Sequence, residues 1–171
     1  MSGGICYDVY SCIGNGKVVE MKDAFDENTD RKAWMGLLAK APEGRVAALL
    51  DAAMARPDFT WLRAPEIGST MVRGRAGGTG APFNIGEMTV TRCALTLRGG
   101  EVGHAYIQGR RKVDAEAAAL VDALMQSSVA DTIRTAVLVP LEAEQTAART
   151  ARAQKAAATK VEFFTMARGE D

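Results

Sequence analysis

The sequence predicts an α+β fold, in which an antiparallel sheet of about four to five strands packs against helices. Apolar residues recur at helical spacing from residue 31 to 56, alternate as in strands from 58 to 109, and return to helical spacing after 113. We expect an N-terminal helical hairpin, one helix packed on the sheet, and a long C-terminal helix for partner contact. At 171 residues the chain is long enough for one domain with a buried core.

That single domain is predicted to span residues 31–171, with a C-terminal docking segment over about 140–171. Residues 1–30 carry turn and acidic signals with few apolar residues, so we expect a weakly ordered extension there. Met21 and the polar residues after it could be the true start, which would make residues 1–20 a start-site artefact.

A helical hairpin is predicted at the start of the domain. Residues 28–30 (Asn, Thr, Asp) can cap a first helix over 31–40, and Pro42 separates it from a second helix over 43–56. Trp34 lies on the apolar face of the first helix. We therefore expect it to pack in the core rather than to bind a ligand.

The sheet is predicted from alternating residues. Two strands meet at a turn over 65–68, and the second of them ends near Arg73. A third strand over 87–98 is joined to a fourth over 101–109 by Gly99-Gly100, the strongest hairpin signal in the chain. One face of the third strand is expected to carry Thr89, Thr91, Cys93, Leu95 and Leu97.

Helices are predicted again after the sheet. Asp114 can cap a helix through Gln126, whose apolar stripe would lie on the sheet. Residues 135–139 are interpreted as a short β-rich piece, and Pro140 suits the first turn of an alanine-rich helix to about Ala158. The stripe of the helix on the sheet consists of Ala117, Leu120, Val121, Leu124 and Met125.

The C-terminal residues 161–168 read as an apolar, strand-like segment. Such a segment frays at a chain end unless it is docked. Phe163, Phe164 and Met166 are therefore predicted to dock on a partner.

The most distinctive stretch is Arg73 to Gly80, which lies between two predicted strands and holds Gly74, Gly77, Gly78 and Gly80. Glycine permits left-handed backbone and close approach, and clustered N–H groups can receive an anion. An anion site, a tight protein contact and a mobile connecting loop all fit this pattern.

Composition excludes several classes of function. Twenty-one basic residues balance twenty-one acidic ones, so no chain-wide excess of charge points to nucleic acid or to a membrane surface. The three cysteines lack Cys-x-x-Cys spacing, which argues against a disulfide framework or a zinc site. The longest apolar run, 136–141, is too short to span a bilayer. A cytoplasmic protein without a bound metal is expected.

The chain shows no self-sufficient catalytic motif. Neither a phosphate-binding loop nor a dinucleotide fingerprint is present, and the only histidine, His104, lies on a predicted strand. One alternative is an autonomous enzyme in which Arg75 and Arg92 bind phosphate while Glu66 or His104 transfers protons. We predict instead no catalytic residue in this chain.

Several separate segments, in order and at consistent spacing, carry a family resemblance. They are Arg75 to Gly80, Thr91-Arg92, Gly109-Arg110 running into Ala115-Glu116, Leu120 to Gln126, and Phe163 to Gly169. Together they resemble the G subunit of the carbon–phosphorus lyase complex, the PhnG family. The resemblance covers about Arg31 to Glu170, leaves residues 1–20 outside, and departs from the family at Ala167, where a bulkier residue is expected.

This resemblance implies a role in bacterial phosphonate breakdown within a cytoplasmic assembly. There a phosphonate displaces adenine from ATP to give ribose 1-phosphonate 5-triphosphate. A sister subunit with an iron–sulfur cluster and S-adenosylmethionine then cleaves the carbon–phosphorus bond. The nucleosidase chemistry is attributed mainly to the I subunit, with the G subunit required alongside it.

The implied partners are the H, I and J subunits and the associated ATP-binding-cassette-type subunits, with no cofactor held by this chain. The residues expected to contact a ligand or a partner are Arg75, Gly77, Gly78, Thr79, Gly80, Arg92 and Arg110.

Overall fold

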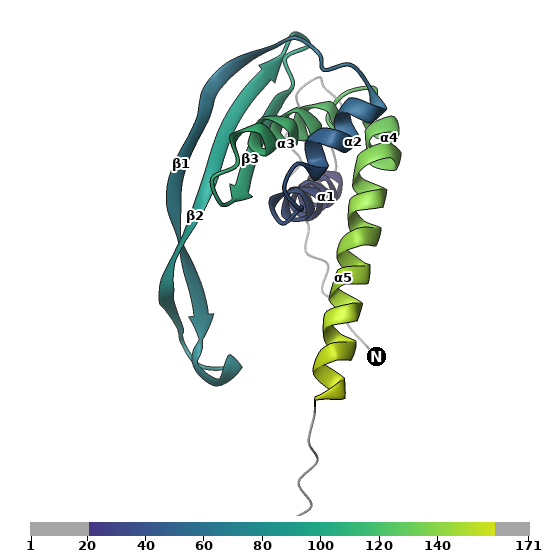
Figure 1. Cartoon of the computed structure of the whole chain (residues 1–171). Helices are drawn as coiled ribbons and strands as arrows, with labels where there is room; N and C mark the ends of the chain where they lie inside the picture. The colour runs from purple at the N-terminus through teal and green to yellow at the C-terminus, as the bar shows by residue number, and fades with distance from the viewer. Residues whose placement is uncertain (1–20, 160–171) are drawn as a thin grey trace, which may run out of the picture.

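A computed structural model describes residues 21–159 of the chain. It confirms the α+β class, with a three-stranded antiparallel sheet, helices on one of its faces and a long C-terminal helix (Figure 1). In chain order the elements are α1 (Met21–Ala39), α2 (Arg45–Ala53), β1 (Phe59–Arg75), the short 3₁₀ turn η1 (Ala76–Gly78), β2 (Pro82–Leu97), β3 (Val102–Gln108), α3 (Lys112–Leu124), α4 (Ala130–Ile133), the π-helical turn η2 (Arg134–Leu138) and α5 (Val139–Ala158).

Within residues 21–159 the sheet has three strands in the order β1-β2-β3, fewer than the sequence predicts. The two strands predicted on either side of residues 65–68 are one continuous strand, β1, which pairs with β2 along its length. The β1–β2 register shifts between Trp61 and Glu66, around Pro65, which has no N–H to give to the ladder. A local irregularity in the strand pairing thus accommodates this proline, which in the sequence suggests a turn.

The hairpin at Gly99-Gly100 is confirmed, since it joins β2 to β3 and Gly100 has a φ of 97°. The inner face of β2 is also confirmed from Thr91 to Leu97, where alternate residues are buried in the core. Towards the other end of β2 the strand leaves the core, and Thr89 is exposed.

α3 packs against this inner face, and the apolar stripe predicted for it is buried. Leu95 of β2, Ile107 of β3 and Leu120 of α3 form the centre of the core and are shielded from solvent. At Gly103 of β3 the helix comes so close that a Cβ atom would overlap the carbonyl oxygen of Ala119. The absence of a side chain at Gly103 thus sets how tightly α3 packs on the sheet.

Two of the predicted helix starts are wrong. α1 begins at Met21, well before the cap expected at residues 28–30. α3 begins at Lys112, so Asp114 lies inside the helix, and its buried carboxylate accepts hydrogen bonds of 3.0 Å from the backbone N–H of Gly44. A carboxylate that looks like a helix cap therefore joins α3 to the start of α2.

The β-rich piece predicted at residues 135–139 is also wrong, because these residues are helical and lead directly into α5. Alternating β-branched residues suggest a strand there. Ile133, Val137 and Leu141, however, recur every four residues and are all fully buried, so a helix buries them on one face. The helix predicted from Pro140 to Ala158 is confirmed as α5.

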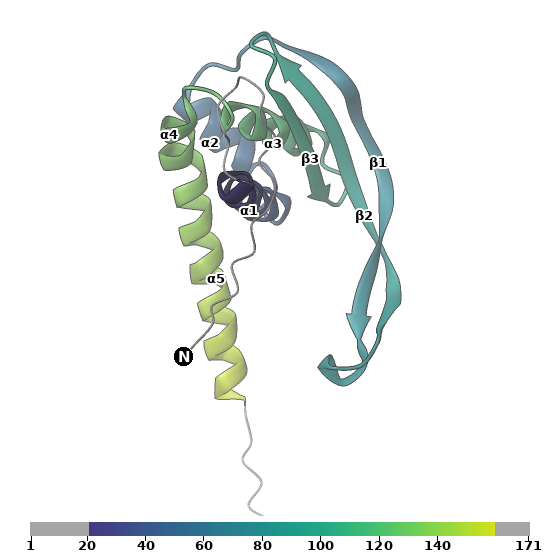
Figure 2. The same ribbon diagram turned by 180° about the vertical axis from the view of Figure 1, so that it is seen from behind.

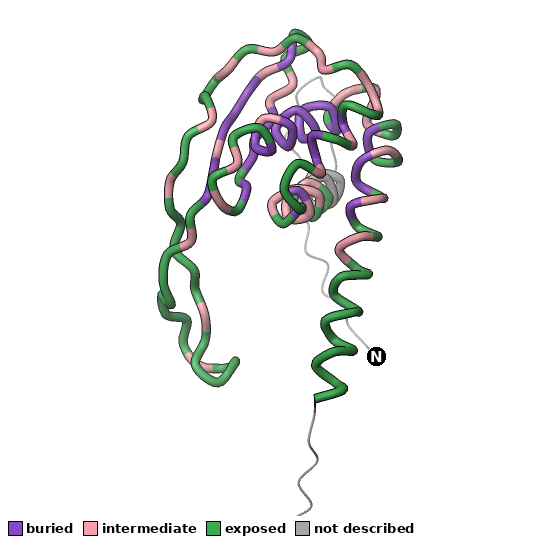
Figure 3. Tube along the Cα trace, viewed as in Figure 1, coloured by how far each residue is buried: buried purple, intermediate pink, exposed green. Residues whose placement is uncertain are grey.

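Two elements extend beyond the core on the same side of the molecule (Figures 1 and 2). β3 pairs with β2 only between Val90 and Thr96, so residues 69–89 form a two-stranded ribbon, called here the arm. The second element is the distal part of α5, residues 146–158, where every residue is exposed (Figure 3). The predicted docking residues Phe163, Phe164 and Met166 lie outside the described residues.

Candidate functional site

The glycine-rich stretch forms the turn at the tip of the arm. Gly77 and Gly78 have φ values of 59° and 80°, in the left-handed region where other residues are strained. The N–H of Gly80 donates to the carbonyl of Ala76 at 3.0 Å, and the Arg75 guanidinium donates to the carbonyl of Gly80 at 3.0 Å. The turn is thus closed by its own hydrogen bonds, and the glycines at 77 and 78 are required for its geometry.

The surface of this turn is open. A Cβ atom on Gly77 or Gly78 would meet no atom within 4 Å, and Thr79 is exposed. A shallow hollow of about 530 Å³ lies beside it, lined by Arg73, Gly74, Arg75, Gly78 and Pro82. The turn therefore presents both backbone and arginine side chains outward, as a contact with an anion or a partner requires.

The arm carries much of the exposed apolar surface of the described residues. Met71, Val72, Phe83 and Ile85 are exposed by 55%, 37%, 50% and 63%. Met71 points to the same side of the ribbon as the core, because it lies four residues beyond Ile67 on β1, and Ile67 pairs with the buried Thr91. Met71 is thus an exposed apolar side chain on the inner face past the end of the core, where Ser69, Thr89 and Glu87 share that face.

The predicted residues Arg92 and Glu66 meet on the outer face of the sheet. The guanidinium of Arg92 donates to the Glu66 carboxylate at 2.6 Å, and Arg63 approaches the same carboxylate at 3.4 Å. This hydrogen bond raises the pKa of Arg92. His104 is exposed on the neighbouring strand, opposite Ala94.

The structure does not bring these residues to Arg75. Glu66 and Arg75 are both on β1, nine residues apart, which is about 30 Å along a strand. Arg92 is already occupied by a carboxylate, so a phosphate would have to displace Glu66 from it. The alternative phosphate site built from Arg75, Arg92 and Glu66 is therefore not assembled within this chain.

Arg110 lies near the base of the arm. It follows Gly109, whose N–H donates to the carbonyl of Thr89 at 2.9 Å and whose φ is 87°. Its side chain is exposed. The predicted contact residues are thus spread along the arm from its tip to its base.

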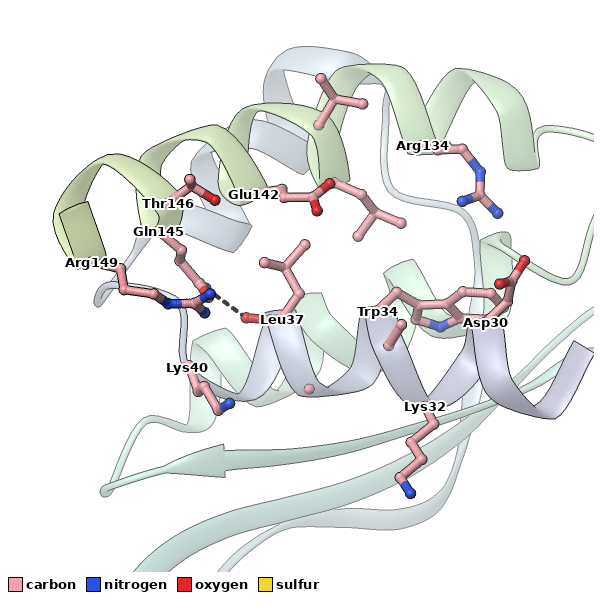
Figure 4. A pocket seen from close by; sticks show the side chains of 14 residues that line it. Asp30, Lys32, Trp34, Leu37, Lys40, Arg134, Glu142, Gln145, Thr146 and Arg149 are labelled. Carbon is pink, nitrogen blue, oxygen red and sulfur yellow. Dashed lines mark hydrogen bonds between the residues drawn. The ribbon is translucent and has the colours of Figure 1, made fainter. Parts of the chain in front are cut away.

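A groove of about 510 Å³, which the sequence does not predict, lies between α1 and the helix formed by η2 and α5 (Figure 4). Leu37, Leu138 and Val139 line it, and Gln145 ties its two walls together by donating to the carbonyl of Leu37 at 2.8 Å. Charged residues from both walls surround this apolar lining: Asp30, Lys32, Lys40, Arg134, Glu142 and Arg149.

Asp122 is a second feature absent from the sequence prediction. Its carboxylate is fully buried and accepts hydrogen bonds from the Arg31 guanidinium at 2.7 and 3.2 Å. The indole N–H of Trp34 and the backbone N–H of His104 each donate to it at 2.9 Å. Trp34 packs against the core as predicted, and it also helps to hold this buried anion. Four donors on α1 and β3 explain why a carboxylate stays inside α3.

The buried thiol of Cys93 lacks the properties of a nucleophile. Burial raises its pKa to about 12, and its Sγ lies 3.1 Å from the carbonyl oxygen of Ala115. Within residues 29–159 no three His, Cys, Asp or Glu side chains gather in a way that could hold a metal ion. No helix between residues 21 and 159 is long and apolar enough to cross a membrane.

Comparisons with known proteins agree on one family. The model of the family described as "Phosphonate metabolism protein PhnG" matches residues 29–169. A relative from Rhizobium meliloti (strain 1021), named alpha-D-ribose 1-methylphosphonate 5-triphosphate synthase subunit PhnG, is 43% identical over 145 residues, which are 82% of this chain and 90% of the relative. The match includes the arm, the inner face of the sheet and α5, so the chain belongs to the PhnG family of phosphonate metabolism proteins.

Proposed function

We propose that this chain is a supporting subunit of an alpha-D-ribose 1-methylphosphonate 5-triphosphate synthase in a cytoplasmic phosphonate-degrading system. In the reaction, the bond between ribose C1 and the adenine nitrogen of ATP breaks and a bond from C1 to a phosphonate oxygen forms, while adenine leaves with the proton that the phosphonate hydroxyl gives up. Membership of the PhnG family and the name of the 43% identical relative support this assignment.

The arm is the structural observation that carries the proposal. A two-stranded ribbon is only marginally stable alone in water, because it has no layer packed on either face. This ribbon nevertheless holds four large exposed apolar side chains, which is typical of an interaction surface. We assign the arm to contact with a sister subunit, which would cover these apolar side chains.

The glycine-rich turn at the tip of the arm has two proposed roles. It contacts either the sister subunit or the triphosphate held at that subunit's site. Both Gly78→Asn and Gly78→Val add a side chain that blocks access to the backbone. Asparagine tolerates the left-handed backbone of the turn and valine does not, so only Gly78→Val also strains the turn. If Gly78→Asn and Gly78→Val both leave assembly intact and abolish adenine release, the turn contacts the ligand. If both prevent assembly, it contacts the subunit.

The test of the proposal is co-expression of the chain with the H, I and J subunits from the same genome, followed by size-exclusion chromatography and an adenine-release assay with ATP and methylphosphonate. We expect a stoichiometric complex that needs this chain for activity. Met71→Glu combined with Ile85→Glu should prevent its incorporation.

Val113→Glu is the matched control, since Val113 is 64% exposed but belongs to α3 and not to the arm. A wild-type chain that stays monomeric beside its sister subunits would contradict the proposal. So would full synthase activity of the sister subunits without this chain.

A further inference from the structure

The distal part of α5 carries a row of positive charge. Arg149, Arg152 and Lys155 are spaced three residues apart, which places them within an arc of about 120° on one side of the helix. All three are exposed, and no carboxylate follows Glu144 in α5. This set of three residues is called here the basic stripe.

The basic stripe has no partner within the described part of the chain. Seven other arginines in residues 29–159 form ion pairs with carboxylates, namely Arg31, Arg45, Arg56, Arg63, Arg92, Arg98 and Arg111. Arg149 and Arg152 form none there. Seven of the eleven other arginines in residues 29–159 thus hold an acidic group, whereas both arginines of the basic stripe are free to meet a group outside the chain.

The stability of α5 itself explains only part of the basic stripe. Cations in the last turn of a helix interact favourably with the helix dipole, and Lys155 lies in that turn. Arg149 and Arg152 precede the last turn, where the dipole has little effect. Their placement needs another cause.

The positive surface continues from the basic stripe onto α1. Arg149 stands at the end of the groove between α1 and α5, and Lys40 stands at the same end on the other wall (Figure 4). Lys40 is exposed and forms no ion pair among the described residues. Lys40 and Arg149 therefore bring two cations to this end of the groove, where the basic stripe begins.

Alanines beside the basic stripe indicate the class of partner. Seven of the thirteen residues 146–158 are alanines, which lie on all sides of the helix, within the basic stripe as well as beside it, and are all exposed. Small residues allow a second helix to approach to about 8 Å between axes. A phosphate backbone gains nothing from such a surface, whereas a protein helix does.

We infer that the basic stripe docks against an acidic helix of a sister subunit in the synthase. This inference rests on the proposed function and adds the chemistry of the contact. Arg149 and Lys155 are about 9 Å apart along the helix axis, so the partner helix presents Asp or Glu at three- or four-residue spacing over about two turns. The arm and the basic stripe are then separate contacts made by the two projecting elements.

The experiment is a binding titration of the purified chain against the co-purified sister subunits at several salt concentrations. Replacing Arg149, Arg152 and Lys155 together by Glu should weaken binding at least about tenfold near physiological salt and flatten the salt dependence. Exchanging the three residues as Arg149→Lys, Arg152→Lys and Lys155→Arg should retain most of the affinity. Since residues 146–158 are exposed, these variants should keep the circular dichroism of the wild type, and reversal of Lys155 in the last turn should lower the melting temperature only slightly.

Single substitutions provide the matched control. Arg152→Glu and Lys112→Glu reverse the same charge at exposed, unpaired positions, and only Arg152→Glu should weaken binding. Equal effects of the two variants, or no effect of the triple reversal, would overturn the inference while a stoichiometric complex still supported the proposed function. Loss of an interaction with a short RNA or DNA duplex, with subunit binding unchanged, would also overturn it and would assign the basic stripe to nucleic acid.

Discussion

Replacing Asp122 by Asn should lower the free energy of unfolding by about 3 kcal/mol. The carboxylate is fully buried, and the substitution removes its charge and puts an amide NH₂ among the N–H donors that now face it. Breaking a buried ion pair costs about 3–5 kcal/mol. The lower end applies here, because the side chain of Arg31 is 32% exposed and water partly screens the pair.

The effect is measurable as a melting temperature. A domain of about 140 residues has an unfolding entropy near 0.3 kcal/mol/K, so a loss of about 3 kcal/mol corresponds to a drop of about 10 °C. Circular dichroism at 222 nm would follow the transition in thermal scans. Glu43→Gln is the control, since Glu43 is exposed and makes no hydrogen bond or ion pair among the described residues.

A double-mutant cycle with Arg31→Gln tests the assigned cause. Once Arg31 is removed, Asp122→Asn should cost less than it does in the wild type, because the charge no longer has its partner. A loss below about 1 kcal/mol for Asp122→Asn, or a cycle with no coupling, would refute the view that this ion pair holds α1 on the core.

Three further outcomes follow from single contacts. Hydrogen bonds from Arg45 lower the pKa of Glu144, so the pair stabilises the fold above the carboxyl's unfolded pKa and loses this contribution as the pH falls through the folded one. Glu144→Gln should therefore lower the melting temperature slightly at neutral pH and leave it unchanged in acid; an equal change at both would contradict this cause. Burial raises the pKa of Cys93 to about 12, so iodoacetamide near neutral pH should label it only after unfolding, as peptide mass spectrometry would show, and rapid labelling of the folded chain would contradict its burial. Gly103→Ala should destabilise by about 1–3 kcal/mol in urea titrations. Gly36→Ala, in a helix with open space around it, should be neutral or stabilising, and similar losses for both would exclude the close helix–strand contact as the cause.

Features set by local periodicity could be predicted from the sequence. The alternation from Thr91 to Leu97 gave the inner face of β2, and the helical spacing after Lys112 gave the buried stripe of α3. In both cases the apolar face of the element packs against one neighbouring layer along this stretch. The periodicity of the sequence therefore matches the burial of the side chains. The glycines at the tip of the arm were predicted to need unusual backbone, and the φ values of Gly77 and Gly78 confirm that need.

Features that depend on contacts between distant parts of the chain could not be predicted from the sequence. Pro65 reads as a turn because the sequence does not show that β2 continues alongside and holds β1 extended. Asp114 reads as a helix cap, yet its partner is a backbone N–H 70 residues away. Asp122 sits in an apolar helix, and only the folded chain brings Arg31 and His104 to it.

The sequence indicates which residues belong to the candidate site, but it does not indicate how far apart they lie in the fold. Arg75 and Arg92 both lie in the sheet segment, and only the register of β1 on β2 shows how far apart they are. The length of the arm follows from β3 being much shorter than its neighbours, with 7 residues against 17 in β1 and 16 in β2. Contact of these residues with a ligand or a partner stays a prediction.

The pairing of Arg31 with Asp122 also constrains when the molecule can fold during its synthesis. The two residues are 91 positions apart, so α1 leaves the ribosome long before the carboxylate that anchors it. At about 5–20 residues per second, the interval is roughly 5–20 s. During that time Trp34 and Leu38 have no core to pack against, and α1 is open to chaperones and proteases. α1 is thus synthesised first, but it forms its ion pair with Asp122 only after α3 has been made and has packed on the sheet.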